Sequence, residues 1–363
     1  MNLLRVWWQR LIAPLDGSLM LISGLLVLLS IDLMSSASPE RMGMQLANIA
    51  TALIVMRVVA GIAPQHLMRL ALAVYVGGLL LLIAVAQFGD ISKGARRWLD
   101  LGLMRIQPSE LMKIAMPLLL AWFFQQRENR LRPADYAIAA LLVLAPVALI
   151  ARQPDLGTAI LVLAAGFYVI FFAGLPWKII AGIAAAALAA APVAWNFLHD
   201  YQQQRILTLL DPEKDPLGKG FHIIQSTIAI GSGGLFGKGW RQGTQAQLEF
   251  IPERHTDFIF AVFGEEFGLL GNLVLLTLYG FLIARGLLIA AQAATLFGRL
   301  LAGAITMIFF TYAFVNMGMV TGILPVVGVP LPLVSYGGTA LVTLFTGIGI
   351  LMSIHKNRML VQK

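Results

Sequence analysis

Charged sequence gives way to apolar sequence within the stretch Gln245-Ala-Gln-Leu-Glu-Phe-Ile-Pro-Glu-Arg-His-Thr-Asp257-Phe-Ile-Phe-Ala-Val-Phe-Gly-Glu-Glu266. Pro252 stops any helix before it. Thr256 is the expected N-cap, because its hydroxyl can accept a hydrogen bond from an unpaired helical N–H. We therefore expect Asp257 on the first turn of a helix, where a membrane meets water. A carboxylate there either interacts with the helix dipole or takes part in chemistry.

The composition of the whole chain indicates a membrane protein. It has 363 residues, of which 59% are hydrophobic and 12% charged, with a mean hydropathy of +0.82. In soluble domains, about a quarter of the residues are charged. The chain has no cysteine, which excludes disulfides and thiolate metal sites. Its net charge of +8 points first to membrane topology and anionic lipid, not to nucleic acid.

The apolar runs predict an all-α polytopic membrane protein with ten transmembrane helices of roughly 20 residues each. These spans form one transmembrane domain over residues 1–363. Residues 1–14 carry two tryptophans and two arginines and are expected to anchor the chain at the interface. The ten spans are predicted near residues 15–34, 43–63, 67–88, 107–124, 135–151, 156–174, 178–197, 257–284, 299–320 and 335–354.

The distribution of Lys and Arg predicts that both termini are cytoplasmic. With that orientation, half of the 26 basic residues lie at inner ends and loops, where few acids accompany them. Many of the others lie in the long outer loop, residues 198–256, between spans seven and eight, and long loops translocate largely regardless of charge. The short outer segment 89–106 holds four more and breaks the positive-inside rule. Either an anionic ligand explains this, or the four charges balance Asp90 and Asp100.

Three of the even-numbered spans are expected to begin at the outer face with an acid, namely Glu110, Asp155 and Asp257. Ser109 and Asp155 are the expected N-caps of spans four and six. Helix N-termini carry partial positive charge and unpaired N–H groups, so several on one face can form an anion site. The alternative is that each acid is ordinary capping chemistry.

Some charges are predicted to lie at membrane depth, where they need partners. Lys113 follows Glu110 by three residues, so the two could neutralise each other. Glu265 and Glu266 lie more than two turns into span eight, and Lys113 is a candidate partner for one of them.

The outer loop contains a glycine-rich run, Gly231-Ser-Gly-Gly-Leu-Phe-Gly-Lys238-Gly. It fails the nucleotide-binding pattern, which requires Gly six residues before the Lys and Ser or Thr after it. Lys238 and Arg241 could still approach a phosphate. No spacing of carboxylates or histidines resembles a metal cage, so His222 and His255 are expected to be structural or interfacial.

Several motifs, in order along nearly the whole chain, resemble the SEDS family (shape, elongation, division and sporulation). The stretch that ends at Asp257 is more similar to the elongation branch of that family than to the division branch. The motifs are Gly94-Ala-Arg-Arg-Trp98-Leu, Gln107-Pro-Ser-Glu-Leu-Met-Lys113, Gln153-Pro-Asp-Leu-Gly-Thr158, Gln225-Ser, the glycine-rich run, Pro252-Glu-Arg-His-Thr-Asp-Phe-Ile-Phe-Ala261 and Val334-Ser-Tyr-Gly-Gly338.

This resemblance implies ten transmembrane helices and a peptidoglycan glycosyltransferase that polymerises lipid II during cell elongation. It implies the bacterial cytoplasmic (inner) membrane, with the active site facing the periplasm or exterior. It also implies a class B penicillin-binding protein as transpeptidase partner, beside other membrane proteins of the elongation complex. By motif, Asp257 is the position that the family treats as essential, and Trp98, Glu110 and Lys113 fall in its functional segments.

The chemistry of that reaction suits the predicted outer face. Lipid II is a diphosphate on a polyprenyl tail, so it needs cations, and Asp257 is the candidate base for the acceptor hydroxyl. Asp257 could instead hold a metal or organise charge, and a divalent cation (Mg or Mn) is possible. A flippase for the same lipid and a membrane scaffold are the alternatives. The candidate substrate-binding residues are Arg96, Arg97, Trp98, Glu110, Lys113, Arg152, Asp155, Lys238, Arg241, His255 and Thr256.

Overall fold

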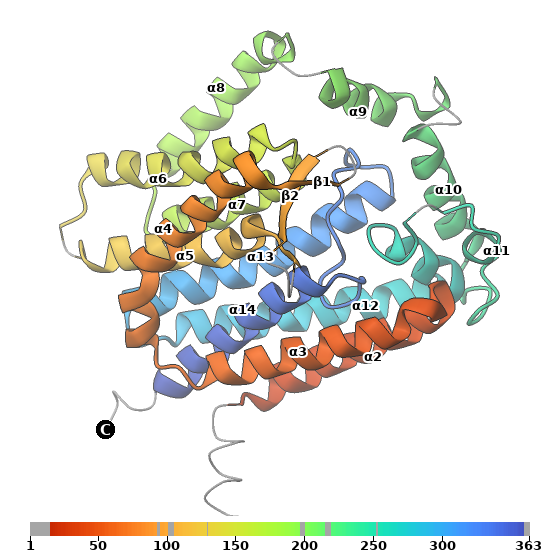
Figure 1. Cartoon of the computed structure of the whole chain (residues 1–363), viewed down its shortest axis with the longest axis horizontal. Coiled ribbons are helices and arrows are strands. Elements are labelled where there is room, and N and C mark those ends of the chain that lie inside the picture. Colours follow the sequence, from red (N-terminus) through yellow and green to blue (C-terminus); the bar gives the residue numbers. More distant parts are fainter. Residues whose placement is uncertain are drawn as a thin grey trace, which may run out of the picture.

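Long apolar helices form the body of the protein (Figure 1). The computed structural model describes residues 15–92, 95–100, 105–128, 130–196, 200–214, 219–251 and 253–358. Within these ranges, seven helices are long and apolar enough to cross a membrane, which makes this a polytopic α-helical membrane protein. They are α2 (Gly17–Ala37), α3 (Met42–Ala60) with the preceding turn η1 (Pro39–Arg41), α4 (Pro64–Phe88), α6 (Pro133–Arg152), α12 (Ile259–Ala291), α13 (Leu296–Val320) and α14 (Gly338–Asn357).

Three further helices lie over the remaining predicted spans. α7 (Leu156–Phe172) and α8 (Trp177–Trp195) are apolar but shorter, and α5 (Pro108–Gln125) contains the charged pair Glu110 and Lys113. A helix therefore covers each of the ten predicted spans. The number of membrane crossings and the cytoplasmic position of both termini stay predictions, and the interfacial anchor at residues 1–14 lies outside the described residues.

Prolines and capping side chains set where several helices begin. Proline occupies the first turn of α4, α5 and α6, where its missing N–H has no helical partner to lose. The Asp155 carboxylate accepts a hydrogen bond from the Thr158 N–H at 3.2 Å, which confirms Asp155 as the N-cap of α7. The expectation for Ser109 was wrong, since α5 begins at Pro108 and Gln107 is its N-cap.

Of the seven long apolar helices, α13 is the most buried, with 72% of its apolar window inside the protein, against 22% for α6. It packs against α12, α7 and α5, and α14 packs against α3. Small residues allow these close approaches: a Cβ at Gly286 of α12 would lie 2.2 Å from Thr306 of α13, and one at Gly349 of α14 would lie 2.7 Å from the Met56 carbonyl of α3. These contacts hold the ends of the helices in place relative to one another.

The long helix α12 is broken at Gly268, whose φ of 66° is not helical. The glycine-rich run fills this break. The N–H groups of Lys238 and Gly239 donate to the carbonyls of Glu265 and Glu266 at 3.0 Å, and Leu269 N–H donates to Gly234 at 2.9 Å. Non-helical backbone at membrane depth needs such internal partners. The glycines are therefore structural: a Cβ at residue 233 or 237 would lie 2.1 Å from a carbonyl oxygen of α12.

The segments between the helices are more ordered than the sequence indicated. The basic segment after α4 forms a three-stranded antiparallel sheet of β1 (Asp90–Ser92), β2 (Ala95–Asp100) and β3 (Arg105–Ile106). Arg105 pairs with Asp90 and Asp100, so part of that charge is balanced within the sheet. The predicted loop 198–256 contains α9 (Asp200–Leu210), η2 (Pro212–Lys214), α10 (Lys219–Ser232) and α11 (Thr244–Gln247).

Candidate functional site

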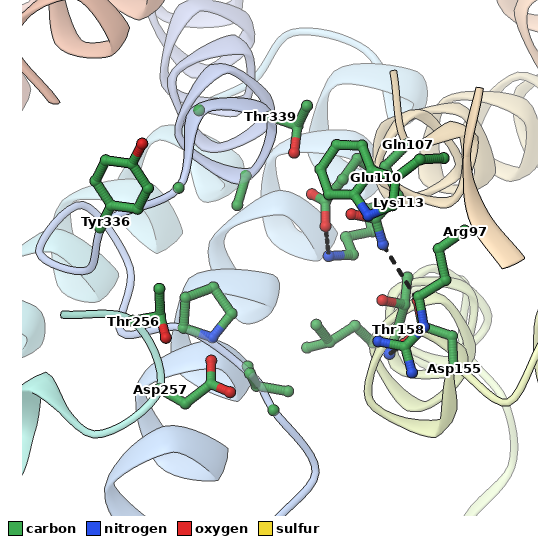
Figure 2. A pocket seen from close by; sticks show the side chains of 18 of the residues that line it. Arg97, Gln107, Glu110, Lys113, Asp155, Thr158, Thr256, Asp257, Tyr336 and Thr339 are labelled. Atoms are coloured by element: carbon green, nitrogen blue, oxygen red, sulfur yellow. Dashed lines mark hydrogen bonds and ion pairs between the residues drawn. The ribbon is translucent and has the colours of Figure 1, made fainter. Parts of the chain in front are cut away.

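A polar cavity of about 610 Å³ lies where the sheet meets the ends of α5, α7, α12 and α14. Figure 2 shows Asp257 and Thr256 on one side of it, and Arg97, Asp155, Glu110 and Lys113 across from them. These side chains come from segments as far apart in the chain as the hairpin strand β2 and the turn before α12. The fold thus gathers one carboxylate from each of the three helix starts that the sequence singled out.

Asp257 is fixed by its backbone and by the loop opposite. The Nδ2 of Asn316, on α13, donates to the Asp257 carbonyl at 2.8 Å and to the Val329 carbonyl at 2.7 Å. Gly328 has a φ of +75°, and a Cβ there would lie 3.3 Å from Oδ2 of Asp257. The carboxylate is therefore held closely against residues 328–329 and is only half-buried.

The expected capping by Thr256 was wrong. α12 begins at Ile259 with Phe258 as its N-cap, so Asp257 lies in the turn just before the helix. The Thr256 hydroxyl donates instead to Glu253, at 3.3 Å to the carbonyl and 3.2 Å to the carboxylate. Thr256 is fixed through its own carbonyl, which accepts from Ser335 Oγ at 2.6 Å. This contact ties the Asp257 turn to the segment that leads into α14.

The far wall combines a cation with the N-terminus of α7. One guanidinium nitrogen of Arg97 donates to the Pro154 carbonyl at 2.8 Å, and its Nε lies 3.8 Å from the Asp155 carboxylate. Gln107 also donates to Asp155, at 3.2 Å. Buried Nε of Arg97 makes no hydrogen bond within the described chain. A guanidinium held beside a helix N-terminus, with one N–H that makes no other hydrogen bond, is well suited to binding an anionic group.

A buried ion pair forms the floor of the cavity. Lys113 is 1% exposed, and its Nζ lies 2.5 Å from Oε1 of Glu110 and also donates to the Tyr312 hydroxyl. The prediction that Glu110 and Lys113 neutralise each other is confirmed. Glu265 and Glu266 are not partners of Lys113: Glu265 pairs with Lys238 at 2.7 Å, and Glu266 accepts from Ser36. Oε2 of Glu110 is buried and makes no hydrogen bond among the described residues, so it remains available to a ligand.

Asp257 also lines a second cavity, of about 260 Å³. Arg205 and Thr208 of α9 and His222 of α10 contribute to this cavity, with Glu253 and Phe258. Burial lowers the pKa of His222, an effect that the Glu253 carboxylate partly opposes, and the His222 ring stacks on Phe258. Asp257 is the residue that the two cavities share.

Not every candidate residue lies in the first cavity. Thr256, Asp257, Arg97, Trp98, Glu110, Lys113 and Asp155 line it. Arg96 and Arg152 are exposed outside it. Lys238 is bound to Glu265 and Thr244, and Arg241 donates to the Ser35 carbonyl, so both lie at the break in α12. His255 contacts Arg41 and the Tyr336 ring behind the rim.

Several lining residues were missed from the sequence. Gln107 begins a motif that was recognised, Arg105 lies just before it, and Tyr336, Gly337 and Gly338 come from the Ser-Tyr-Gly-Gly run before span ten. That run leads into span ten, an even-numbered span like those that begin with the three acids, which was a usable signal. Asn316 and Tyr312 gave no signal, because each is one polar residue in the apolar run of α13 and only the packing shows which group it bonds.

The metal-binding capacity of the site is limited. Among the described residues, no group of three His, Asp or Glu side chains is close enough to hold a metal ion. Mg²⁺ and Mn²⁺ prefer oxygen ligands, and Mg²⁺ usually keeps several waters. A divalent cation here would take most of its ligands from a substrate diphosphate and from water, with one carboxylate such as Asp257.

Comparison with known proteins shows which family this chain belongs to. The model of the FtsW/RodA/SpoVE cell cycle proteins matches residues 11–360, and the chain belongs to this family, which is the SEDS family that its motifs indicated. It is 54% identical to the peptidoglycan glycosyltransferase MrdB of Escherichia coli K12, over 99% of this chain and 98% of that protein. It is 38% identical to the probable peptidoglycan glycosyltransferase FtsW of Geobacter metallireducens, over 76% of this chain and 74% of that one.

Solved structures show the same fold. A chain of a peptidoglycan synthase complex, in which polymerization and crosslinking are coordinated, is 38% identical, with a TM-score of 0.83. The match covers 94% of this chain and 98% of that one. The rod shape determining protein RodA of Thermus thermophilus is 32% identical, with a TM-score of 0.72, over 94% of this chain and 97% of that one.

Proposed function

We propose that this chain is a peptidoglycan glycosyltransferase that polymerises lipid II at the outer face of the cytoplasmic membrane during cell elongation. The relatives named above, of which the first is 54% identical over nearly the full length, support the reaction class. The observation in the structure that carries the proposal is the position of Asp257, which lines two cavities. A polymerase must hold a donor and an acceptor on the two sides of one reacting bond.

The larger cavity fits the donor diphosphate. Arg97, Arg105 and Lys113 line it, and the N-terminus of α7 faces the same space. Guanidinium groups and helix N-termini are the usual phosphate ligands in proteins. The buried Nε of Arg97 gives a donor that is already positioned, so binding would not have to order a flexible side chain. Lys113 lies at the floor, where Glu110 and the Tyr312 hydroxyl hold its ammonium group as a positioned hydrogen-bond donor.

The smaller cavity fits the acceptor sugar. It mixes polar groups, Arg205, Thr208, His222 and Glu253, with the apolar faces of Ile223, Phe258 and Val326. A carbohydrate presents both hydroxyls and C–H faces, and such a mixed lining suits it. Burial keeps His222 neutral at neutral pH by lowering its pKa, so it can accept a hydrogen bond from a hydroxyl.

The proposed reaction is a single displacement. The acceptor hydroxyl attacks the anomeric carbon of the donor, and the bond between that carbon and the diphosphate oxygen breaks. Asp257 takes the hydroxyl proton as the new glycosidic bond forms, and the polyprenyl diphosphate leaves with the bonding electrons. General base catalysis of this kind contributes typically 10²–10⁴-fold. Arg97 and Lys113 stabilise the charge that develops on the leaving diphosphate.

We infer two further properties from the relatives. One solved relative belongs to a complex that coordinates polymerization with crosslinking, so a class B penicillin-binding protein is the proposed partner, alongside other membrane proteins of the elongation complex. The polar cavity lies at the ends of helices that sequence analysis placed outside the cell, so the active site is proposed to face the periplasm or exterior. A flippase would need polar groups along the whole membrane depth, whereas the apolar residues Leu118 to Phe124 of α5 continue beyond Lys113.

Glycan synthesis from defined components tests the proposal. The purified chain is mixed with lipid II, with and without the transpeptidase partner and with Mg²⁺, Mn²⁺ or a chelator, and glycan strands are separated by gel. The polymerase proposal predicts strands of many disaccharides and release of polyprenyl diphosphate. Transbilayer movement of labelled lipid II in vesicles without any strand formation would contradict it.

A further inference from the structure

An apolar groove, distinct from the two cavities beside Asp257, lies at the opposite end of the bundle. It has a volume of about 430 Å³. The N-terminal half of α6, the C-terminal half of α7 and the start of α8 form it, with residues such as Val143, Phe167 and Ile179. α6 ends and α7 begins beside the polar cavity, so their other ends are separated from it by the length of α7, roughly 25 Å at 1.5 Å per residue.

The groove is open because α8 leaves the bundle. Figure 1 shows α8 running outward from the side of the body towards α9. Apolar side chains along α8 are strongly exposed, including Ile183 at 59%, Leu188 at 77% and Val193 at 60%. An apolar helix of this kind has its exposed face covered by lipid, since no soluble surface would leave so much apolar area in water. The space between α8 and the α6–α7 pair is therefore a lipid-facing groove.

The rim of the groove carries positive charge next to its lining residues. Pro133 and Ile179 line the groove, and each directly follows a basic residue, Arg132 and Lys178 respectively. Arg132, Lys178 and the nearby Arg130 are exposed, and their side chains have no ion-pair partner among the described residues. The two acids near this rim are otherwise engaged: Asp135 pairs with Arg127 at 2.9 Å, and Glu128 accepts from Gln125.

An aromatic residue completes the rim. Trp177 is 73% exposed and packs edge-on against Phe171 at 5.6 Å. Tryptophan at that position is typical of the headgroup level of a bilayer. An apolar lining with an exposed tryptophan and exposed cations next to its residues matches an acyl chain, the bilayer interface and an anionic headgroup.

We propose that this groove binds an anionic phospholipid of the leaflet opposite the active site. One acyl chain occupies the space between α6, α7 and α8, and the phosphate lies against Arg132 and Lys178, with Arg130 close by. Basic pockets between transmembrane helices are a general form of anionic lipid site. Such a lipid fills the gap beneath α8 and supports the angle at which α8 leads towards α9, whose Arg205 and Thr208 line the cavity beside Asp257.

Native mass spectrometry of the purified full chain tests this site without requiring turnover. The protein is titrated with phosphatidylglycerol or phosphatidylcholine of matched acyl chains, and the retained lipid is counted. We expect wild type to retain phosphatidylglycerol in preference, and R132Q/K178Q to lose that preference severalfold. The control R299Q/K356Q removes two exposed cations from the same end of the bundle, on α13 and α14, and is expected to behave as wild type.

A groove-filling variant tests the acyl-chain half of the proposal. Ala140 lines the groove, and Ala140→Phe is expected to reduce retention of both lipids. Because the R132Q/K178Q changes are on exposed residues, they decide the outcome even if A140F does not fold. The proposal is overturned if R132Q/K178Q retains phosphatidylglycerol as wild type does. It is equally overturned if undecaprenyl phosphate displaces the phospholipid at equal concentration, because the groove would then belong to the substrate tail.

Discussion

The side-chain amide of Asn316 lies 2.8 Å from the carbonyl oxygen of Asp257 and 2.7 Å from that of Val329. One fully buried residue of α13 therefore joins the turn that carries the candidate base to the loop that faces it. The Asn316 amide therefore helps to hold the Asp257 turn against the facing loop.

Asn316→Leu should reduce activity more than it reduces stability. Loss of the amide leaves two carbonyls without this donor, at a cost of about 1–3 kcal/mol, and lets the Asp257 turn move. A displacement of about 1 Å at a catalytic group can cost about a hundredfold in rate. Thermal unfolding in detergent and glycan synthesis from lipid II measure the two effects. Ser353→Ala removes the hydrogen bond from the buried Ser353 to the Ile62 carbonyl, far from the site, and should lower stability without lowering specific activity.

The buried pair Lys113 and Glu110 predicts a non-additive pair of substitutions. Lys113→Met alone leaves a buried carboxylate uncompensated, which costs about 3–5 kcal/mol. The double variant E110Q/K113M should recover much of that stability, because no charge is then left unpaired. If the pair also serves the substrate, the recovered protein stays inactive. Full activity in the stable double variant would show that the pair is structural only.

Gly328→Ala probes the contact between the loop and the Asp257 carboxylate. The positive φ of +75° costs an alanine about 1–2 kcal/mol, and its Cβ would lie 3.3 Å from Oδ2 of Asp257. Gly174→Ala is the matched control, since Gly174 has a φ of +96° and its Cβ would meet only the Tyr136 hydroxyl at 3.8 Å. Both variants should lose similar stability, but only G328A should lose activity. Equal activity in the two would argue against close packing of Gly328 on Asp257.

His222 predicts a pH dependence of stability. Burial lowers its pKa in the folded protein below the usual value of about 6.5, and Glu253 only partly opposes this. The unfolded chain then binds the proton more tightly, so stability is complete above about pH 6.5 and is lost as the pH falls towards the folded pKa. Wild type should therefore melt at lower temperature in mild acid, and His222→Gln should lose that component. An identical acid dependence in both proteins would exclude His222 as its source.

The sequence predicted the helices well because length and hydropathy alone are enough to recognise a membrane span. It also predicted that Glu110, Asp155 and Asp257 share one face, since consecutive spans alternate direction. It could not predict which groups meet across the bundle. Lys113 was a candidate partner for Glu265 or Glu266 as well as for Glu110, but it pairs with Glu110, and Glu265 is bound by Lys238 from the glycine-rich run. That run resembled a phosphate loop because both need glycines where backbone approaches closely, and here the partner is the break in α12.

The β-sheet that carries Arg97 and Trp98 was not predicted from the sequence. Its strands are only two to six residues long, so they show no usable alternation in the sequence. The basic residues there were noted as a violation of the positive-inside rule, and two alternatives were left open. The structure supports a part of each: Arg105 balances Asp90 and Asp100, whereas Arg97 reaches across to Pro154 and Asp155 and lines the cavity.

Asp257→Asn tests the central claim most directly. The amide keeps the shape and the hydrogen bonds of the side chain but cannot take a proton, so it separates base chemistry from positioning. Single-turnover formation of the first glycosidic bond by purified protein, with lipid II binding measured in parallel, is the required measurement. We predict near-normal binding and a rate that falls about a hundredfold or more. Bond formation at the wild-type rate in the Asp257→Asn protein would contradict the account.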